Sequence, residues 1–378
     1  MSTADHIISL KNNGEVWAWG DNTFGQLGDN TETNKSSPIL VVGSHSFIEI
    51  FGVRVNSVAR KADGSLWAWG DNTFGQLGDS TVESKSSPVL VVGAHSFVEI
   101  SMGLYHSMAR KSDGSVWCWG WNNLGQLGDN DAGVNKSSPV LVVGSHSFVE
   151  ISTGDNHSMA RKSDGSLWTW GINTYGQLGD DTKTNRSSPV AVVGNHSFVE
   201  TSGGNEHSAA RKADGSVWTW GFNITGQLGD GTVESKSSPV LVVGAHSFVE
   251  IDACGYHSIA RKDDGSIWSW GNNVYGQLGD DTKTNRSSPV LVVGNHSFVE
   301  ASGGVDFRFA RKANGEVWSW GRNEFGQLGD GTVESKSSPV LVVGSHSFKG
   351  LETKVPQWIL YTVPFTSEGW VQVKIVNE

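Results

Sequence analysis

The chain has 378 residues, a formal net charge of −11, 48 glycines and nine prolines. Because nucleic-acid affinity rests largely on Lys and Arg that neutralise phosphates, the acidic balance argues against a nucleic-acid partner. No run approaches the roughly 18 consecutive apolar residues of a membrane-spanning helix, so we expect no membrane insertion. Abundant glycine with sparse proline suits a turn-rich β protein better than a disordered chain.

The N-terminal sequence MSTADHIISLKNNGE lacks the basic segment and the apolar core of a secretory signal. We therefore expect no signal peptide and a cytoplasmic or virion-associated protein. The two cysteines, Cys118 and Cys254, occupy unlike positions in the repeats described next, so we expect two thiols and no disulfide framework.

A segment of the form WGxNxxGQLGD occurs seven times in the chain. The glycine of each Trp-Gly pair recurs at steps of 50 or 51 residues, at Gly20, Gly70, Gly120, Gly171, Gly221, Gly271 and Gly321. A fixed period of this length indicates a propeller or a solenoid.

Each unit contains four short β-type segments, which in residues 97–143 read FVEIS, HSMAR, SVWCWG and SPVLVV. Between the second and third segments lies KSDGS, whose Asp-Gly pair favours a hairpin turn. No segment shows the apolar period of about 3.6 residues that is typical of a helix. We therefore predict an all-β fold in which residues 1–348 form a seven-bladed β-propeller of four-stranded blades.

The two ends of the chain predict how the ring closes. Residues 6–20 align with residues 106–120, so the first unit lacks its first strand, while the last unit continues past its fourth strand into SFKGLETKV. We predict that a C-terminal strand completes the N-terminal blade, which would protect the sheet edges. Residues 349–378 would hold this closing strand and a C-terminal β-hairpin tail, a candidate assembly contact; which C-terminal strand closes the ring stays open.

The repeated residues predict the core. Fourteen of the 17 tryptophans form pairs two residues apart, such as Trp17 and Trp19, which places each pair on one face of its strand. We expect these rings to pack between blades. Each glycine of GQLG is expected to supply a positive-φ turn, and the Asp that follows to cap that turn.

These words together resemble a known repeat. WGxNxxGQLGDGT, preceded by xHSxARKxDGSVW and followed by SPVxVxG, resembles the repeat of the regulator of chromosome condensation family over about residues 4–348. The resemblance implies a seven-bladed propeller. Members of that family include an exchange factor for a small GTPase that also binds nucleosomes, a plant ultraviolet photoreceptor and bacterial inhibitors of β-lactamase. The near-identical copies also resemble repeats in environmental bacterial and tailed-phage proteins.

Two family roles fit this sequence poorly. The photoreceptor carries Trp and Arg immediately before the repeat histidine, where this chain has pairs such as Tyr105 after Leu104 and Asn156 after Asp155. The exchange factor inserts a β-wedge, whereas no unit here exceeds its neighbours by more than one residue. The net charge further disfavours chromatin.

The seven copies differ from one another mainly at two places. One set of residues precedes the second strand and includes Leu104, Tyr105, Asp155, Asn156, Asn205, Glu206 and Tyr256. The other set follows Trp-Gly and includes Trp121, Leu124, Ile172, Tyr175, Phe222, Ile224, Tyr275, Arg322 and Phe325. If successive strands are antiparallel, both loops leave the same end of a blade. We therefore predict that these residues form one face that binds a protein or a glycan, since large exposed apolar groups tend to mark contacts. Neutral drift on exposed loops is the alternative.

No residue set indicates catalysis, a metal or a cofactor. The histidines of the HSF word, one per unit, would point to separate places in a ring, so we expect a structural hydrogen-bonding role for them. A second histidine set is interrupted by Asn56 and Phe307, and no distinctive residues are identified that break the repeat near the axis.

The sequence thus predicts a non-enzymatic binding propeller, with no cofactor, whose diversified face binds a protein or glycan, on a bacterial or phage particle surface. A soluble inhibitor or regulatory propeller, and a structural spacer without a ligand, remain as alternatives.

Overall fold

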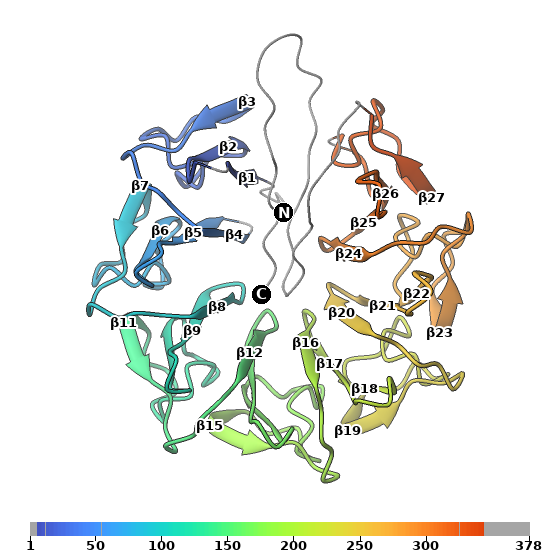
Figure 1. Cartoon of the computed structure of the whole chain (residues 1–378). Helices are drawn as coiled ribbons and strands as arrows, with labels where there is room; N and C mark the ends of the chain where they lie inside the picture. Colours follow the sequence, from blue (N-terminus) through green and yellow to red (C-terminus); the bar gives the residue numbers. More distant parts are fainter. Residues whose placement is uncertain (1–5, 12, 54, 325, 344–378) are drawn as a thin grey trace.

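The computed structural model describes residues 6–11, 13–53, 55–324 and 326–343. Within these residues every regular element is a β-strand, and the 27 strands form seven antiparallel sheets around a central axis (Figure 1). The predicted seven-bladed β-propeller is confirmed. None of the described segments is a helix long and apolar enough to cross a membrane.

Each complete blade has four strands in chain order from the axis outward, here called A to D. The A strands are β4 (Glu49–Val53), β8 (Glu99–Met102), β12 (Glu150–Thr153), β16 (Glu200–Gly203), β20 (Glu250–Cys254) and β24 (Glu300–Gly303). The B strands are β1 (His6–Leu10), β5 (Asn56–Arg60), β9 (His106–Arg110), β13 (His157–Arg161), β17 (His207–Arg211), β21 (His257–Arg261) and β25 (Phe307–Arg311).

The outer two strands of the blades repeat as regularly. The C strands are β2 (Val16–Gly20), β6 (Leu66–Gly70), β10 (Val116–Gly120), β14 (Leu167–Gly171), β18 (Val217–Gly221), β22 (Ile267–Gly271) and β26 (Val317–Gly321). The D strands are β3 (Lys35–Leu40), β7 (Lys85–Leu90), β11 (Lys136–Leu141), β15 (Arg186–Ala191), β19 (Lys236–Leu241), β23 (Arg286–Leu291) and β27 (Lys336–Leu341).

We number the blades 1 to 7 in chain order, so that blade 1 holds β1 to β3, blade 2 holds β4 to β7 and blade 7 holds β24 to β27. Among the described residues, blade 1 contains three strands and the other six blades contain four. Among the residues that the structure describes between 6 and 343, the N-terminal blade thus has no A strand, which is the strand that the sequence predicted to be missing from the first unit. The domain boundary at residue 348, and the closing strand and hairpin predicted in residues 349–378, lie outside the described residues.

The glycine of Trp-Gly is required by the close approach of two loops. In blade 3, Trp117 pairs with Leu141, but the register between β10 and β11 shifts before Gly120, which pairs with Lys136. Gly120 has φ of +104°, and a Cβ atom there would lie 2.5 Å from the carbonyl oxygen of Tyr105. Only glycine tolerates both constraints, so the C strand ends in the same dipeptide in every copy.

The second tryptophan of each pair packs between blades, as predicted. Trp119 is fully buried, and its Nε1 donates a hydrogen bond to the carbonyl oxygen of Gln76 in the preceding blade at 2.9 Å. The same bond, at 2.8 to 3.0 Å, recurs at all six junctions from blades 1–2 to blades 6–7. Each junction thus combines a buried ring with a hydrogen bond to the GQLG loop.

The first tryptophan of each pair also packs against the cluster between two blades, as Trp117 does, but it is only half-buried. The Trp117 ring contacts the imidazole of His95, with ring centroids 4.4 Å apart, and the Lys111 ammonium, which lies 4.7 Å from the ring centroid. The HSF histidines therefore have the structural role that was expected, but His95 fulfils it by ring contacts with Phe97 and Trp117 and not by a hydrogen bond. Burial and the nearby Lys111 lower the pKa of His95.

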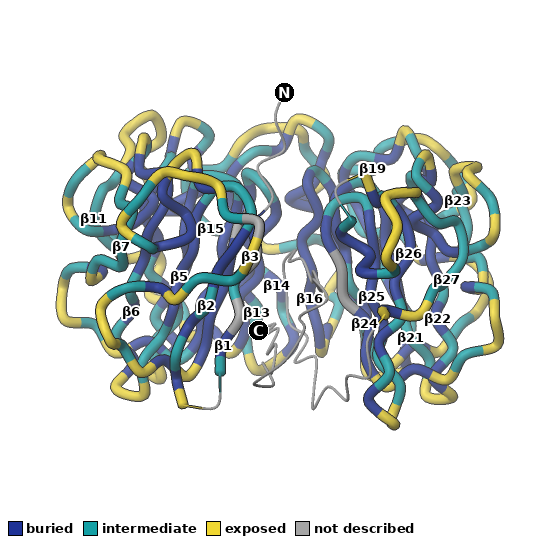
Figure 2. Tube along the Cα trace, turned by 90° about the horizontal axis from the view of Figure 1, so that it is seen from above, coloured by how far each residue is buried: buried dark blue, intermediate teal, exposed yellow. Residues whose placement is uncertain are grey.

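The exposed parts of the propeller lie at its two ends and on its outer rim (Figure 2). A proline occurs within every D strand, as Pro88 does in β7, and removes a donor that could pair with another sheet edge. Cys118 and Cys254 are both buried and are not joined in a disulfide, as expected.

Candidate partner-binding face

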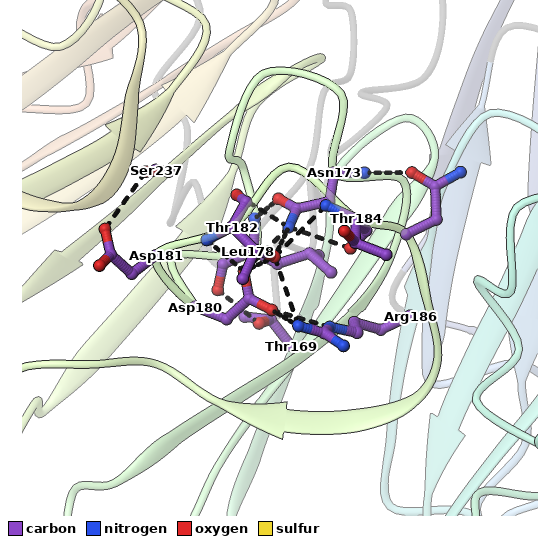
Figure 3. Close-up of polar contacts among 10 residues, drawn as sticks. Thr169, Asn173, Leu178, Asp180, Asp181, Thr182, Thr184, Arg186 and Ser237 are labelled. Carbon is purple, nitrogen blue, oxygen red and sulfur yellow. Dashed lines mark hydrogen bonds and ion pairs between the residues drawn. The ribbon is translucent and has the colours of Figure 1, made fainter.

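A repeated hydrogen-bond network holds the loop between the C and D strands in shape (Figure 3). In blade 4, the Asn173 amide donates to Asp180 at 2.9 Å and to the carbonyl oxygen of Thr182 at 3.2 Å, while its Oδ1 accepts from the Leu178 N–H at 2.9 Å. Asp180 also accepts from the Thr182 N–H at 3.1 Å, so the predicted turn-capping role of this Asp is confirmed. The invariant words WGxN and GQLGD therefore build one rigid loop.

The same loop is tied to its strands and to the next blade. Arg186 at the start of β15 forms an ion pair with Asp180 at 2.7 Å. Across the blade junction, the Asp181 N–H donates to the carbonyl oxygen of Ser237 at 2.9 Å. The variable residues consequently project from a fixed frame.

The two variable sets meet at one end of each blade. The N–H of the residue after Trp-Gly donates to the carbonyl oxygen of the residue before the B strand, as Trp121 does to Tyr105 at 2.9 Å and Phe222 to Glu206 at 2.9 Å. Equivalent bonds occur in blades 2 to 7. We call this end, formed by the A–B and C–D loops, the variable face.

An aromatic cluster spans blades 2 and 3 on the variable face. The ring centroid of Phe74 lies 5.1 Å from that of Tyr105 and 6.1 Å from that of Trp121, and the Tyr105 and Trp121 centroids are 6.3 Å apart. All three side chains are half-buried. Phe74 was not among the predicted binding residues, although it has the same place in its repeat as Tyr175.

A second aromatic cluster joins blades 4, 5 and 6. The Tyr175 and Phe222 ring centroids are 4.6 Å apart, and those of Phe222 and Tyr256 are 5.8 Å apart. These three side chains are also half-buried.

A charged pairing occupies the equivalent place between blades 6 and 7. The Arg322 guanidinium lies 5.2 Å from the Tyr275 ring centroid and forms ion pairs with Glu324 at 2.6 Å and with Asp306 at 3.8 Å. In all three cases a C–D loop residue of one blade contacts the residue after Trp-Gly in the next blade.

These contacts correct the expectation of freely exposed aromatic side chains. Trp121, Tyr105 and Phe222 each bury one part of the ring against a neighbouring blade and leave another part accessible. Among the predicted apolar residues, Ile224 is much more exposed, at 66 %. It lies one residue earlier in its loop than Phe74 does, and Thr225 occupies the position equivalent to Phe74.

The other predicted residues are distributed over the same loops. Leu104, Leu124, Asn156 and Ile172 are half-buried, whereas Asn205 is buried and its N–H donates to the carbonyl oxygen of Gly255. Burial, together with the nearby Asp155 carboxylate, raises the pKa of Glu206. Phe325 lies outside the described residues.

Comparison with known families shows to which family the chain belongs. The family model for the RCC1-like domain matches residues 1–247 and 98–359. The chain belongs to the RCC1-like domain family. The predicted resemblance to the regulator of chromosome condensation is thereby confirmed, while a bacterial or phage origin stays a prediction.

Several solved structures share the fold. Prp20p from Saccharomyces cerevisiae is 21 % identical with a TM-score of 0.75, and the alignment covers 89 % of this chain and 88 % of Prp20p. Yeast RCC1 (Prp20) bound to Kap60 is 19 % identical (TM-score 0.76, 91 % of this chain and 86 % of that one). Human WBSCR16 is also 19 % identical (TM-score 0.76, 89 % and 95 %). No sequence among the curated proteins matches the chain.

Near the axis, this RCC1-like propeller departs from its own repeat, which the sequence analysis missed. Arg308 stands on β25 where five other blades carry serine, and its guanidinium pairs with Asp252 on β20 at 3.0 Å. The Cys254 thiol donates to the same carboxylate at 2.9 Å. An alignment of the repeats shows that both residues depart from the repeat, but it does not show that their side chains form a contact.

The second histidine set contributes to the blade junctions of the RCC1-like ring. His106 Nε2 lies 2.9 Å from Ser158 Oγ in the next blade, and His157 Nε2 lies 2.9 Å from Ser208 Oγ. Burial lowers the pKa of His106 to about 3 and that of His157 to about 4, so both are neutral near pH 7. The described residues contain no group of three or more His, Cys, Asp or Glu placed to hold a metal ion.

Proposed function

We propose that the chain is a non-enzymatic protein-binding propeller and that its variable face binds the partner. The observation that carries the proposal is the pair of aromatic clusters around Phe74 and Phe222, each assembled from variable residues of adjacent blades on an otherwise constant frame. Half-buried aromatic rings offer large contact area at low conformational-entropy cost, and such residues are enriched in protein interfaces.

The relatives support a protein as the partner. The structure of Prp20p was described together with its binding properties to Gsp1p and histones, and that of yeast RCC1 (Prp20) contains Kap60. Those partners belong to those proteins. For this chain we propose a protein of its own biological setting, and we retain the surface of a bacterial or phage particle as the setting that the near-identical repeats favour.

A glycan is the second candidate, favoured by the rings of Tyr105, Trp121 and Tyr256, which are half-buried and so keep part of their surface accessible. Sugar rings stack on such faces as apolar side chains do. A competition experiment distinguishes the two candidates, because the partner would be displaced from the variable face by free protein in one case and by free oligosaccharide in the other.

The test uses substitutions that borrow residues from other repeats. Trp121→Asn and Phe222→Asn introduce the side chain that Asn272 provides at the equivalent position in blade 6. The full chain carrying both changes should lose at least tenfold in affinity for the partner captured by crosslinking from its native source. Unchanged affinity would contradict the proposal.

The matched control changes exposed apolar residues away from the variable face. Leu141 and Leu241 are 50 % and 48 % exposed on the D strands, and blade 4 already carries Ala191 at that position. Leu141→Ala with Leu241→Ala should leave partner affinity unchanged. Loss of binding in this control would instead place the binding site on the outer rim. In a separate competition experiment, displacement of the partner by free oligosaccharide but not by protein would favour the glycan.

A further inference from the structure

The contacts that join neighbouring blades are nearly the same at every junction. A buried Trp Nε1 donates to the Gln carbonyl oxygen of the preceding blade at six junctions. A B-strand His Nε2 lies 2.7 to 2.9 Å from the B-strand Ser Oγ of the next blade at four junctions. Because the same atoms meet each time, these contacts do not distinguish a correct neighbour from another copy of the repeat.

The junction between blades 6 and 7 is different. Arg308 is 0 % exposed and reaches across the junction to Asp252, whose Oδ2 lies 3.0 Å from Nη1. Both residues replace serine: Asp252 corresponds to Ser202 in blade 5, and Arg308 corresponds to Ser258 in blade 6. The two replacements lie on opposite sides of the same junction, so the negative charge of Asp252 is paired with the positive charge of Arg308.

Several buried polar atoms around this ion pair have no hydrogen-bond partner, which is energetically unfavourable. Among the described residues, Nε and Nη2 of Arg308 have no hydrogen-bond partner, and neither has either ring nitrogen of His257, whose serine partner Arg308 has replaced. Buried ion pairs are often no more stabilising than well-packed neutral residues, and an incompletely satisfied pair is less so. Net stability therefore does not explain why the pair is present.

We propose that the Asp252–Arg308 pair specifies blade order, making blades 6 and 7 neighbours in a chain whose buried junction contacts are otherwise nearly the same. If blade 7 docked beside blade 5, Arg308 would face Ser202 and its buried charge would have no carboxylate. Removing one member of a buried pair is strongly unfavourable, so this mispairing is penalised. Intermolecular swapping of repeats is a characteristic misfolding route of repeat proteins, and it is the event that the pair suppresses.

The first experiment restores the repeat sequence at both positions. The full chain with Asp252→Ser and Arg308→Ser is unfolded in denaturant and refolded at several concentrations, beside the unmodified chain. Size-exclusion chromatography with native mass spectrometry measures the fraction of swapped dimer. We expect a melting temperature equal to or above that of the parent, and at least a threefold rise in the dimer fraction that grows with concentration.

The second experiment duplicates the pair instead of removing it. Ser202→Asp with Ser258→Arg places an equivalent pair between blades 5 and 6, so that each arginine has two carboxylates to choose from. We expect the dimer fraction to rise here too, although every charge has a partner in the native ring. A role in stability alone would not produce this result.

Single substitutions separate specificity from simple packing. Asp252→Ser leaves the Arg308 guanidinium buried without its carboxylate and should lower the melting temperature strongly, and adding Arg308→Ser should recover it. If the double-serine chain refolds with the dimer fraction of the parent, the proposal is wrong, whatever its melting temperature. That outcome decides the question even if the duplicated variant fails to fold.

Discussion

Trp119 of blade 3 and Gln76 of blade 2 are joined by a hydrogen bond of 2.9 Å from the indole N–H to the main-chain carbonyl oxygen. Ser107 Oγ donates to the same oxygen at 3.0 Å. One carbonyl of the GQLG loop thus binds two strands of the next blade, which links the most constant word of the repeat to the packing between blades.

This bond predicts a graded effect of replacing tryptophan by phenylalanine. Trp119→Phe removes the indole donor but leaves Ser107 on the Gln76 oxygen, so the free energy of unfolding should fall by about 1 to 3 kcal/mol, including the lost ring volume. Trp19 is the matched control, because its Nε1 has no partner among the described residues. Trp19→Phe should cost less in chemical denaturation; equal losses would mean that the hydrogen bond contributes nothing measurable.

The Trp-Gly glycine predicts a difference between two glycine substitutions. Gly120 and Gly133 both have positive φ, of +104° and +94°, but a Cβ atom would meet the Tyr105 carbonyl oxygen only at Gly120, and nothing within 4 Å at Gly133. Gly133→Ala should therefore cost roughly 1 to 2 kcal/mol from backbone strain alone.

Gly120→Ala should cost clearly more, because the loop holding Tyr105 must also move away from the introduced methyl group. Thermal and urea unfolding of the two variants measure the difference. If both variants lose the same stability, the close approach of the A–B and C–D loops is not a constraint.

The sequence predicted the elements well because its period is explicit. Glycines of defined position, paired tryptophans and the Asp-Gly turn each have a local meaning, so the strands, turns and buried rings of a blade follow from one copy and repeat in the others. The two variable sets were also placed correctly at one end, because antiparallel strands alternate in direction.

What the sequence could not show is which side chains meet across blades. Phe74 contacts Trp121, whereas Ile224, one residue earlier in its loop, is exposed. Which of these two loop positions reaches the neighbouring blade becomes visible only once the blades are packed together. Arg308 and Asp252 are 56 residues apart, and no local pattern connects them. The role of a residue that differs from the repeat therefore depends on which side chains it contacts in the packed ring.

The buried B-strand histidines predict a loss of stability in acid. Burial lowers the pKa of His106, His157 and His207 to about 3, 4 and 3, while in the unfolded chain each would titrate near its ordinary value of about 6.5. Between these values the unfolded state binds more protons than the folded state, so stability is present above pH 6.5 and falls as the pH is lowered toward 4.

At pH 5 the loss should be roughly 2 kcal/mol for each of these histidines, from about 1.4 kcal/mol per pH unit over 1.5 units. Blade 2 carries Asn56 at the same position, so His106→Asn, His157→Asn and His207→Asn supply an unprotonatable control. The triple variant should show a flatter dependence of urea midpoint on pH between 7 and 5. An unchanged slope would place the acid sensitivity in other groups.

The N-terminal blade predicts different outcomes for two C-terminal truncations. Its inner strand β1 belongs to a sheet of three described strands, and the buried Trp19 Nε1 has no partner among the described residues. If the segment after residue 348 supplies the missing strand, a chain ending at residue 355 should keep the melting temperature of the parent, because only the predicted hairpin is removed. A chain ending at residue 348 should melt lower and self-associate through the unpaired edge of β1, since unprotected sheet edges pair with other chains.

Circular dichroism and analytical ultracentrifugation of the two truncated chains measure both effects. Equal melting temperatures for the parent and the chain ending at 348 would mean that residues 349–378 do not complete the N-terminal blade, and unfolding of the chain ending at 355 would assign the closure to the predicted hairpin itself.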